Sequence, residues 1–322
     1  MRKLLIVGAG QLGSRHLQGA LVAQESLYIV VVDPAQESLI IADERSKQVK
    51  WGNKNSRIRY STKLPESENF DVCIIATAAQ VRADVTKALL ITNNNSVKHI
   101  IFEKVLFQKV EHYSEIQALL QECKAQGWVN CPRRIFPTYQ ELKHHLDTSQ
   151  PIRMTVTGNA WGMACNSVHF IDLFSYLVDR ADLDVIKVAF DSEIIESKRI
   201  GFYEITGEIE FAIGNNTLRI ESGKTLIPSL QVTIENGHIH HIINEVQGTW
   251  LYNNGAVSTQ HSYTPLFQSQ LTGANISELL VSNQCQLTPF AESCSLHTPF
   301  IKVVLEHLSK TLNVHLNACP IT

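Results

Sequence analysis

Three glycines near the N-terminus carry the clearest chemical signal in the chain. Gly8, Gly10 and Gly13 form a Gly-x-Gly-x-x-Gly pattern directly after an apolar strand, Leu4 to Val7. The first glycine permits a tight turn, the second lets the backbone approach a pyrophosphate, and the third lets helix and strand pack closely. The pyrophosphate is expected at the positive N-terminus of the following helix. The residues predicted to contact the dinucleotide here are Gly8, Gly10, Gln11, Leu12 and Gly13.

An acidic residue after the next strand distinguishes between two dinucleotides. The apolar strand Tyr28–Val32 ends in Asp33, twenty positions after Gly13. A carboxylate there accepts hydrogen bonds from both ribose hydroxyls and repels a 2′-phosphate. The sequence therefore predicts NAD as the cofactor, with NADP disfavoured. The alternative is a structural βαβ turn that binds no cofactor.

A Glu-Lys pair, Glu103-Lys104, follows the apolar strand His99–Phe102. The carboxyl end of a central parallel strand is where such sheets bind ligands. A lysine beside an oxidised nicotinamide, and partly buried, has a lowered pKa and becomes a usable acid or base. The alternative is a surface salt-bridge pair.

A histidine and an aspartate form a second candidate for proton transfer. His169 and Asp172 are three residues apart, so a helix places them on one face. Asp172 would then orient His169 and stabilise its protonated form. Oxidation of a secondary alcohol requires loss of the hydroxyl proton, and a neutral histidine suits that task near pH 7. The alternative is a histidine that only packs within its helix.

Three further side chains are candidates for substrate binding. Arg133 and Arg134 follow the last strand of the first half, and an arginine pair can bind a carboxylate or phosphate through its forked donors. An inter-domain salt bridge is the alternative for both. Trp161 could stack on a sugar ring, with a core position as its alternative.

The elements that position these residues divide the chain into two parts of an α/β protein. The first 130 residues alternate apolar strands with helices, which predicts a doubly wound parallel sheet. Its strands are expected at Leu4–Val7, Tyr28–Val32, Ile58–Tyr60, Asp71–Ala76, His99–Phe102 and Trp128–Asn130, and its clearest helix at His112–Gln126, capped by Gly127.

After Pro132 the pattern changes to that of a mostly antiparallel sheet with helices. Alternating runs separated by Gly214-Asn215 and Asn236-Gly237 predict the sheet between Val185 and Trp250. A strand is expected at Ile152–Ala160 and helices at Pro137–Leu146, Ser167–Leu177 and Pro299–Leu312. We therefore predict a dinucleotide-binding domain at 1–132 and a substrate-binding domain at 133–322, and leave open whether the C-terminal helix packs back on the first.

Composition excludes several classes of protein. The chain of 322 residues is 44% hydrophobic with a net charge of −3, which favours neither nucleic acid nor an anionic membrane as a partner. No apolar stretch reaches the roughly 20 residues of a membrane span. Seven cysteines without a regular framework or export signal predict reduced thiols in the cytoplasm. His238, His240 and His241 lack the spacing of a ligand set, so no metal is predicted.

Taken together, Gly8-x-Gly10-x-x-Gly13-x-x-His16, Glu103-Lys104 and His169-x-x-Asp172 resemble the Gfo/Idh/MocA oxidoreductases, over nearly the whole chain. The resemblance implies a Rossmann domain followed by an α/β domain with a large, mostly antiparallel sheet. It implies that Lys104 lies near the nicotinamide, and that His169 is the acid/base with Asp172 close by. It further implies cofactor contacts from Thr77, Ala78 and Glu103, and a homodimer or homotetramer formed through the second-domain sheet.

Two positions depart from the family pattern. Val105 replaces the usual proline of Glu-Lys-Pro, which suggests a different path for the loop. Cys165 occupies the position, four residues before the histidine, where the family often has aspartate. Either the neighbouring Asn166 takes over by hydrogen bonding to substrate, or the chemistry differs, or activity is weak.

The resulting hypothesis is an NAD-dependent oxidoreductase that acts on CH–OH groups. Its substrate would be a carbohydrate-type secondary alcohol, either a sugar or a nucleotide sugar. Lyase or glycosidase chemistry on the same residues is one alternative. A non-catalytic regulator that senses a dinucleotide is another, because the family aspartate is missing at Cys165.

Overall fold

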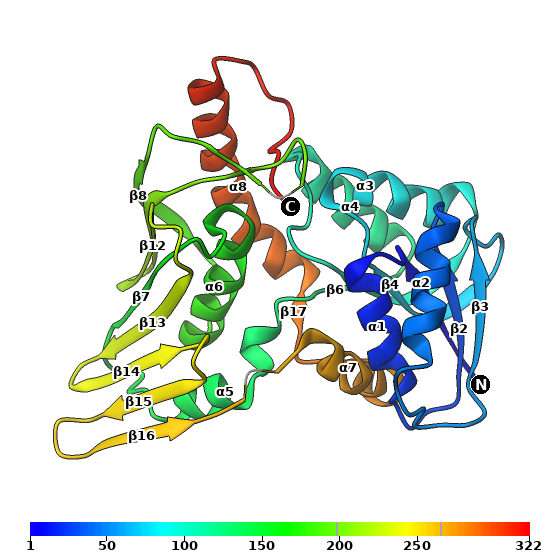
Figure 1. The fold of residues 1–322 in the computed structure, drawn as a ribbon, viewed down its shortest axis with the longest axis horizontal. Coiled ribbons are helices and arrows are strands. Elements are labelled where there is room, and N and C mark those ends of the chain that lie inside the picture. Colours follow the sequence, from blue (N-terminus) through cyan, green and yellow to red (C-terminus); the bar gives the residue numbers. More distant parts are fainter. Residues whose placement is uncertain (198, 265) are drawn as a thin grey trace. The chain divides into compact units, whose positions relative to one another are not determined.

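The computed structural model describes residues 1–197, 199–264 and 266–322, and the chain divides into two compact units (Figure 1). Unit 1 comprises Met1–Phe107, Glu111–Pro132 and Leu266–Ala291. Unit 2 comprises Gln108–Val110, Arg133–Pro265 and Glu292–Thr322. One change of unit therefore falls between Pro132 and Arg133, and a later segment returns to unit 1.

Unit 1 is built on a seven-stranded sheet in the order β17-β6-β5-β4-β1-β2-β3. Its strands are β1 (Arg2–Val7), β2 (Leu27–Val32), β3 (Arg57–Ser61), β4 (Asn69–Ile75), β5 (Ser96–Phe102), β6 (Gln126–Val129) and β17 (Thr288–Pro289). All pair in parallel except β17, which pairs antiparallel to β6. The apolar residues of the central strands are buried, as expected for a sheet covered on both faces. The predicted doubly wound parallel sheet is confirmed.

The helices of unit 1 are α1 (Gln11–Leu21), α2 (Gln36–Ser46), α3 (Ala79–Lys87), α4 (Glu111–Glu122) and α7 (Gln268–Ser282). Helix α7 packs along α1, where a Cβ on Gly273 would lie 2.8 Å from the carbonyl oxygen of Gly19. The prediction that Gly127 caps a helix is wrong. Gly127 lies inside β6, and a glycine suits this position because a Cβ there would lie 2.7 Å from the Cβ of Phe290.

Unit 2 is built on an eight-stranded sheet in the order β16-β15-β14-β13-β7-β12-β11-β8. Its strands are β7 (Ile152–Asn159), β8 (Asp184–Phe190), β11 (Gly207–Ile213), β12 (Asn216–Gly223), β13 (Ser229–Asn236), β14 (Ile239–Asn244), β15 (Thr249–Asn253) and β16 (Ser258–Ser262). Only β7 and β12 pair in parallel, so the predicted mostly antiparallel sheet is confirmed. A separate pair is formed by β9 (Ile195–Glu196) and β10 (Tyr203–Glu204).

The helices of unit 2 are α5 (Pro137–His144), α6 (Met163–Val178) and most of α8 (Phe290–Leu312), with a short 3-10 turn at Pro132–Ile135. Helix α6 lies against β7 and β12 (Figure 1). It begins at Met163, earlier than predicted, because Gly162 takes a left-handed conformation (φ +75°) that starts the helix there. Helix α8 also begins earlier than predicted and contains Pro299. Among the described residues, no helix combines the length and apolar character needed to cross a bilayer.

Candidate functional site

The glycine loop of unit 1 has the geometry that a dinucleotide requires. Gly8 has a φ of +96°, and a Cβ there would lie 3.0 Å from Ala76 and Thr77 of the segment after β4. A Cβ on Gly13 would lie 1.7 Å from the carbonyl oxygen of Gly8, so no other residue fits without a backbone shift. A Cβ on Gly10, in contrast, would meet nothing within 4 Å. Gly8 and Gly13 therefore serve packing, whereas Gly10 borders open space.

The N-terminus of α1 faces that space without a side-chain cap. Gly10 is the N-cap residue, and within the described part of the chain the structure gives this helix start no side-chain capping hydrogen bond. The first N–H groups of the helix and the positive end of its dipole suit an anion such as pyrophosphate. Gln11 is held at its amide oxygen by Arg45 of α2 (2.8 Å), which also donates to Ser14. The residues present thus fit the predicted cofactor.

Asp33 holds the same loop from the end of β2. Its Oδ2 accepts the N–H of Ala9 at 2.7 Å, and its Oδ1 accepts the N–H of Ala35 at 2.9 Å. The carboxylate is half-buried, and each oxygen has a second lone pair beyond these bonds. Asp33 therefore anchors the glycine loop as well as being the predicted ribose ligand.

Arg82 of α3 connects the segments after β4 and β5. Its guanidinium donates to the carbonyls of Thr77, Val105 and Leu106, the last at 2.7 Å. Arg82 was not among the residues predicted from the sequence. A signal was present, because Ala79, Arg82, Ala83 and Thr86 have the i, i+3, i+4, i+7 spacing of one helix face and are all buried.

Glu103 is a buried carboxylate at the end of β5. Its Oε1 accepts hydrogen bonds from His16 Nε2 and Asn130 Nδ2, each at 2.7 Å. Burial raises its pKa, but the bonds from His16 and Asn130 and the charge of Arg82 outweigh burial, so the pKa of Glu103 lies below its ordinary value. His16, noted in the sequence only as part of a motif, thus joins α1 to β5. The predicted contact between Glu103 and cofactor stays a prediction.

Lys104 follows directly and is half-buried. The peptide bond between Lys104 and Val105 is cis, although residue 105 is not proline. Ala78, the other predicted cofactor residue of this region, is the N-cap of α3. Unit 1 therefore brings the glycine loop, Asp33, Thr77, Ala78, Glu103 and Lys104 to the carboxyl ends of adjoining strands β1, β2, β4 and β5.

In unit 2 the candidate residues form an accessible stripe on α6. Most of this helix is buried, whereas Cys165, Asn166 and His169 are half-buried and share one face by their spacing. Asn166 donates from Nδ2 to the carbonyl of Trp161 at 2.7 Å. Trp161 donates in turn to the carbonyl of Glu221 and packs edge-to-face on Phe170. The structure thus groups three predicted substrate residues, Trp161, Asn166 and His169, on one element and the loop before it.

Glu204 of β10, which sequence analysis missed, lies at the first turn of α6. Its Oε2 accepts the N–H of Ala164 at 2.8 Å. A Cβ on Gly162 would lie 3.2 Å from Glu204 Oε1, 2.9 Å from Cys165 Sγ and 3.1 Å from Asn166 Nδ2. A carboxylate from a distant strand therefore stands beside the position where the family pattern has a helical aspartate. The contact between β10 and α6 exists only in the folded chain, so the sequence alone could not reveal this carboxylate.

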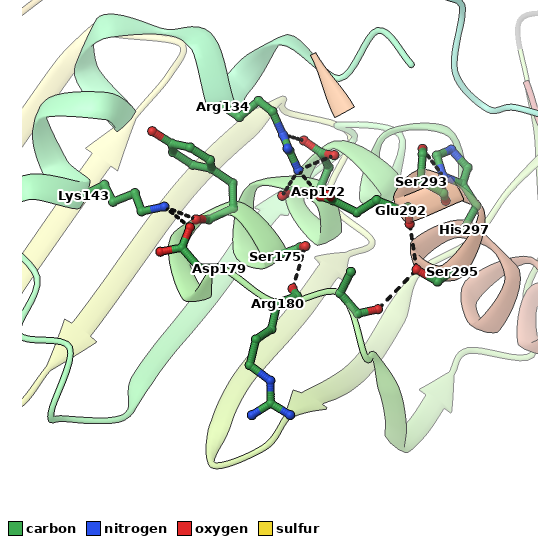
Figure 2. A network of polar contacts seen from close by, with 12 residues as sticks. Arg134, Lys143, Asp172, Ser175, Asp179, Arg180, Glu292, Ser293, Ser295 and His297 are labelled. Carbon is green, nitrogen blue, oxygen red and sulfur yellow. Dashed lines mark hydrogen bonds and ion pairs between the residues drawn. The ribbon is translucent and has the colours of Figure 1, made fainter. Parts of the chain in front are cut away.

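Asp172 forms a buried ion pair with Arg134 (Figure 2). Arg134 donates from Nε and Nη2 to the two carboxylate oxygens of Asp172, at 2.9 and 3.0 Å, and from Nη2 to Glu292 at 2.8 Å. Burial lowers the pKa of Arg134, but these two carboxylates outweigh burial and raise it above its ordinary value. The expected orientation of His169 by Asp172 stays a prediction.

Arg133 is likewise held by a carboxylate. It donates from Nε and Nη2 to Glu245, at 2.8 and 2.6 Å, and its guanidinium lies 4.2 Å from the centre of the Phe170 ring. Both arginines therefore form salt bridges, and these join residues of unit 2 to one another. The predicted contact of Arg133 and Arg134 with substrate stays a prediction. In the described ranges of the chain, no group of three or more His, Cys, Asp or Glu residues could hold a metal ion.

Comparison with known protein families gives a match for the N-terminal part of the chain. Residues 2–131 match the model of an oxidoreductase family with an NAD-binding Rossmann fold, Gfo/Idh/MocA. The N-terminal part of the chain therefore matches the NAD-binding domain of the Gfo/Idh/MocA oxidoreductases. NAD, predicted from the glycine pattern and Asp33, is the cofactor of this family. No curated protein sequence matches the chain.

Solved structures resemble the chain over nearly its full length. An oxidoreductase from Agrobacterium radiobacter in complex with NAD⁺, L-tartaric acid and magnesium is 12% identical, with a TM-score of 0.70, and the match covers 93% of this chain and 94% of that one. UDP-N-acetylglucosamine 3-dehydrogenase from Acidithiobacillus ferrooxidans is 12% identical, with a TM-score of 0.68 and 98% of both chains covered. A 3-ketoreductase from Actinomadura kijaniata, in complex with TDP-benzene and NADP, is 10% identical, with a TM-score of 0.66 and 94% and 96% covered. At these identities the likeness establishes the fold.

Proposed function

We propose that this Gfo/Idh/MocA protein is an NAD-dependent oxidoreductase that moves a hydride between the nicotinamide and a secondary alcohol of a sugar or nucleotide sugar. The observation that carries the proposal is the uncapped N-terminus of α1 beside the open space at Gly10, bordered by Asp33. When bound there, the dinucleotide supplies the hydride acceptor or donor.

The protein's own contribution in this proposal is proton transfer and positioning. His169 takes the hydroxyl proton, directly or with Lys104 in a relay, because hydride loss from CH–OH requires it. Asn166 and Trp161, which lie with His169 on the accessible stripe, bind the sugar. Arg133, Arg134 and Asp172 act by holding α6, since their charged groups are already paired with one another or with Glu245 and Glu292.

The substrate class is proposed by analogy with the structural neighbours. One is named for UDP-N-acetylglucosamine, and another was determined with TDP-benzene. Arg133 and Arg134 already bind carboxylates of their own unit through Nε and Nη2, so a substrate phosphate would have to share these guanidinium groups or bind elsewhere. A screen should therefore include free sugars beside UDP- and TDP-linked sugars.

Calorimetry with NAD and NADP in parallel tests the cofactor. We expect NAD to bind more tightly, and Asp33→Ala to weaken NAD binding by about tenfold or more, the value of one charge-assisted hydrogen bond. In the substrate screen, Lys104→Ala and His169→Ala should each lose about 10²–10⁴-fold in turnover, as for removal of a general acid or base. Both variants should still bind NAD. Absence of binding by either dinucleotide would refute the proposal.

A second candidate is a dinucleotide-sensing regulator without turnover, favoured by the absence of the family aspartate at Cys165. Tight NAD binding with no turnover across the screen would support it. Lyase or glycosidase chemistry on the same residues is separated by product analysis, since it gives a new double bond or a released sugar without net change in NADH.

We further propose that the protein is a homodimer or homotetramer formed through the outer face of the unit 2 sheet. One residue from each strand, paired in register with its neighbours, forms a row across this face. From β8 to β16 the row changes from charged to less polar residues: Lys187, Glu210, Arg219, Thr155, Thr233, Ile242, Leu251 and Gln260. Ile242 and Leu251 are only half-buried in the single chain. Pairing this face with a second copy would bury their apolar surface.

Mass photometry at micromolar concentration tests the assembly. The wild type should give at least the mass of a dimer, and Ile242→Glu should shift it toward monomer by placing a charge in the apolar part of the face. Lys302→Glu, on the distant helix α8, is the control and should leave the mass unchanged. A wild-type protein that is only monomeric would end this proposal.

A further inference from the structure

A cluster of buried ionisable side chains joins the segments predicted to hold the cofactor. His16 of α1, Arg82 of α3 and Glu103 at the end of β5 are each at most 2% exposed. None is used in the proton transfer proposed above. All three belong to unit 1, and so do their partners Asn130 and Thr272.

His16 connects three elements through both nitrogens of its ring. Nε2 pairs with Glu103 Oε1 at 2.7 Å, and Nδ1 pairs with Thr272 Oγ1 of α7 at 2.9 Å. The histidine lies one turn after Gly13, in the helix whose N-terminus faces the open space at Gly10. The position of α1 is thereby tied to the end of β5.

Arg82 ties the same strand end to the next loop. Its guanidinium donates to the carbonyls of Val105 and Leu106 on one side and of Thr77 on the other. An arginine can do this because its planar fork presents several donors in fixed directions, whereas a lysine has a single nitrogen. Burial lowers the pKa of Arg82 to about 10, so the group is still charged at neutral pH.

Lys104 therefore stands between two anchored neighbours. On its N-terminal side, Glu103 is held by His16 and Asn130. On its C-terminal side, the carbonyl of Val105 is held by Arg82. The opposite charges of Glu103 and Arg82 favour each other's charged form, so loss of either side chain leaves the other buried charge with one partner fewer.

We propose that His16 and Arg82 are positioning residues, which fix Lys104 relative to the glycine loop by holding the residues before and after it. The significance of this for catalysis rests on the function proposed above. The positioning itself is a property of the free protein and can be tested without substrate.

The reactivity of the Lys104 amine is the readout, because it depends on the local environment of the side chain and not on stability. Trace acetic anhydride labels each amine in proportion to its unprotonated, accessible fraction, and mass spectrometry compares Lys104 with the N-terminal amine. Wild type, His16→Leu and Arg82→Lys are labelled with and without NAD⁺. Thr272→Val, which removes the second partner of His16 and leaves Glu103 in place, serves where either variant does not fold.

We expect each folded cluster variant to change the relative labelling rate of Lys104 by about threefold or more, equivalent to half a pKa unit. Other lysines should keep their rates. The matched control is Val97→Ala, a cavity at the opposite end of β5 that lowers stability without touching either anchor. NAD⁺ should alter Lys104 labelling in the wild type and in the control, and less in the cluster variants.

The proposal is overturned if Lys104 labels at the wild-type rate in the cluster variants, or if Val97→Ala changes the rate equally. Failure of the proposed function looks different. In that case NAD⁺ has no effect on the wild type, whereas the comparison between variants of the free protein still decides whether His16 and Arg82 position Lys104.

Discussion

The two units hold their candidate functional groups by different means. In unit 1 the groups predicted to face the cofactor are largely backbone, the glycine loop and the N–H groups at the start of α1, and contacts to Asp33 and Arg82 are made through N–H and carbonyl groups. In unit 2 the groups are side chains on α6, and the helix is held by paired charges such as Arg134–Asp172. A backbone site fails when a side chain is added, whereas a site held by ion pairs fails when a side chain is removed.

The first prediction breaks the arrangement in unit 2. Arg134→Ala should lower the free energy of unfolding by about 3–5 kcal/mol, because it leaves the carboxylate of Asp172, which is 1% exposed, without its bidentate partner. Urea unfolding monitored by fluorescence measures the effect. Arg180→Ala is the control, since Arg180 and Asp182 form a pair with side chains 53% and 58% exposed, and it should change stability little. Equal losses in the two variants would contradict the distinction.

The second prediction breaks the arrangement in unit 1. Gly13→Ala places a Cβ 1.7 Å from the carbonyl oxygen of Gly8, so the helix and the loop must separate. We expect a loss of about 2–3 kcal/mol in stability, typical of overpacking, together with loss of NAD binding. Thermal unfolding and calorimetry measure the two effects.

Gly10→Ala is the matched control within the same loop. Its Cβ meets no protein atom within 4 Å, so stability should change by less than about 1 kcal/mol. NAD binding should nevertheless weaken, because the added methyl group enters the space predicted for the pyrophosphate. If Gly10→Ala bound NAD as tightly as the wild type, the cofactor would have to lie elsewhere.

The third prediction sharpens the comparison by pH. His241 of β14 is fully buried and accepts a hydrogen bond from Trp250 Nε1 at 3.0 Å. Burial, with smaller effects of His145 and His240, lowers the pKa of His241 to about 4. Above the unfolded-state pKa of about 6.5 this histidine is neutral in both states, so its contribution to stability is complete there.

As pH falls from about 6.5 to about 4, the unfolded chain takes up the proton and the folded protein does not. We therefore expect unit 2 to lose about 2–3 kcal/mol over this range. His241→Asn, which keeps an acceptor for Trp250, should flatten this part of the profile. Hydrogen exchange resolved by region measures the two units separately. An identical pH dependence in His241→Asn and the wild type would show that other groups govern it.

The sequence predicted unit 1 more completely than unit 2, for a reason visible in particular residues. Gly8, Gly10, Gly13 and Asp33 act through local backbone geometry, so their spacing alone carries the information. The buried strands of a parallel sheet are predicted equally well, because they are continuous apolar runs. Helix α7 was not predicted, because its membership of unit 1 depends on a contact with Gly19 that is remote in the chain.

In unit 2 the pattern of residue types left alternatives open, because the partners of its charged side chains come from distant segments of the chain. Arg133 and Arg134 were equally suited to a substrate anion and to a salt bridge, and the salt bridges they form depend on where Glu245, Asp172 and Glu292 lie. Helix α6 was predicted to begin four residues late, because the left-handed conformation of Gly162 has no unique signature in the sequence.

By itself, the sequence determined the α/β class, the two kinds of sheet, the dinucleotide fingerprint and the candidate acid–base residues. Hydrophobic periodicity and backbone constraints act over a few residues, so a short stretch of sequence is enough to predict their effect. Only the tertiary structure decided that Arg82, His16 and Glu204 stand beside the predicted sites, and that Asp172 is paired with Arg134. These are contacts between polar groups from distant segments of the chain. Each group forms its hydrogen bonds with the partners that the fold brings within bonding distance.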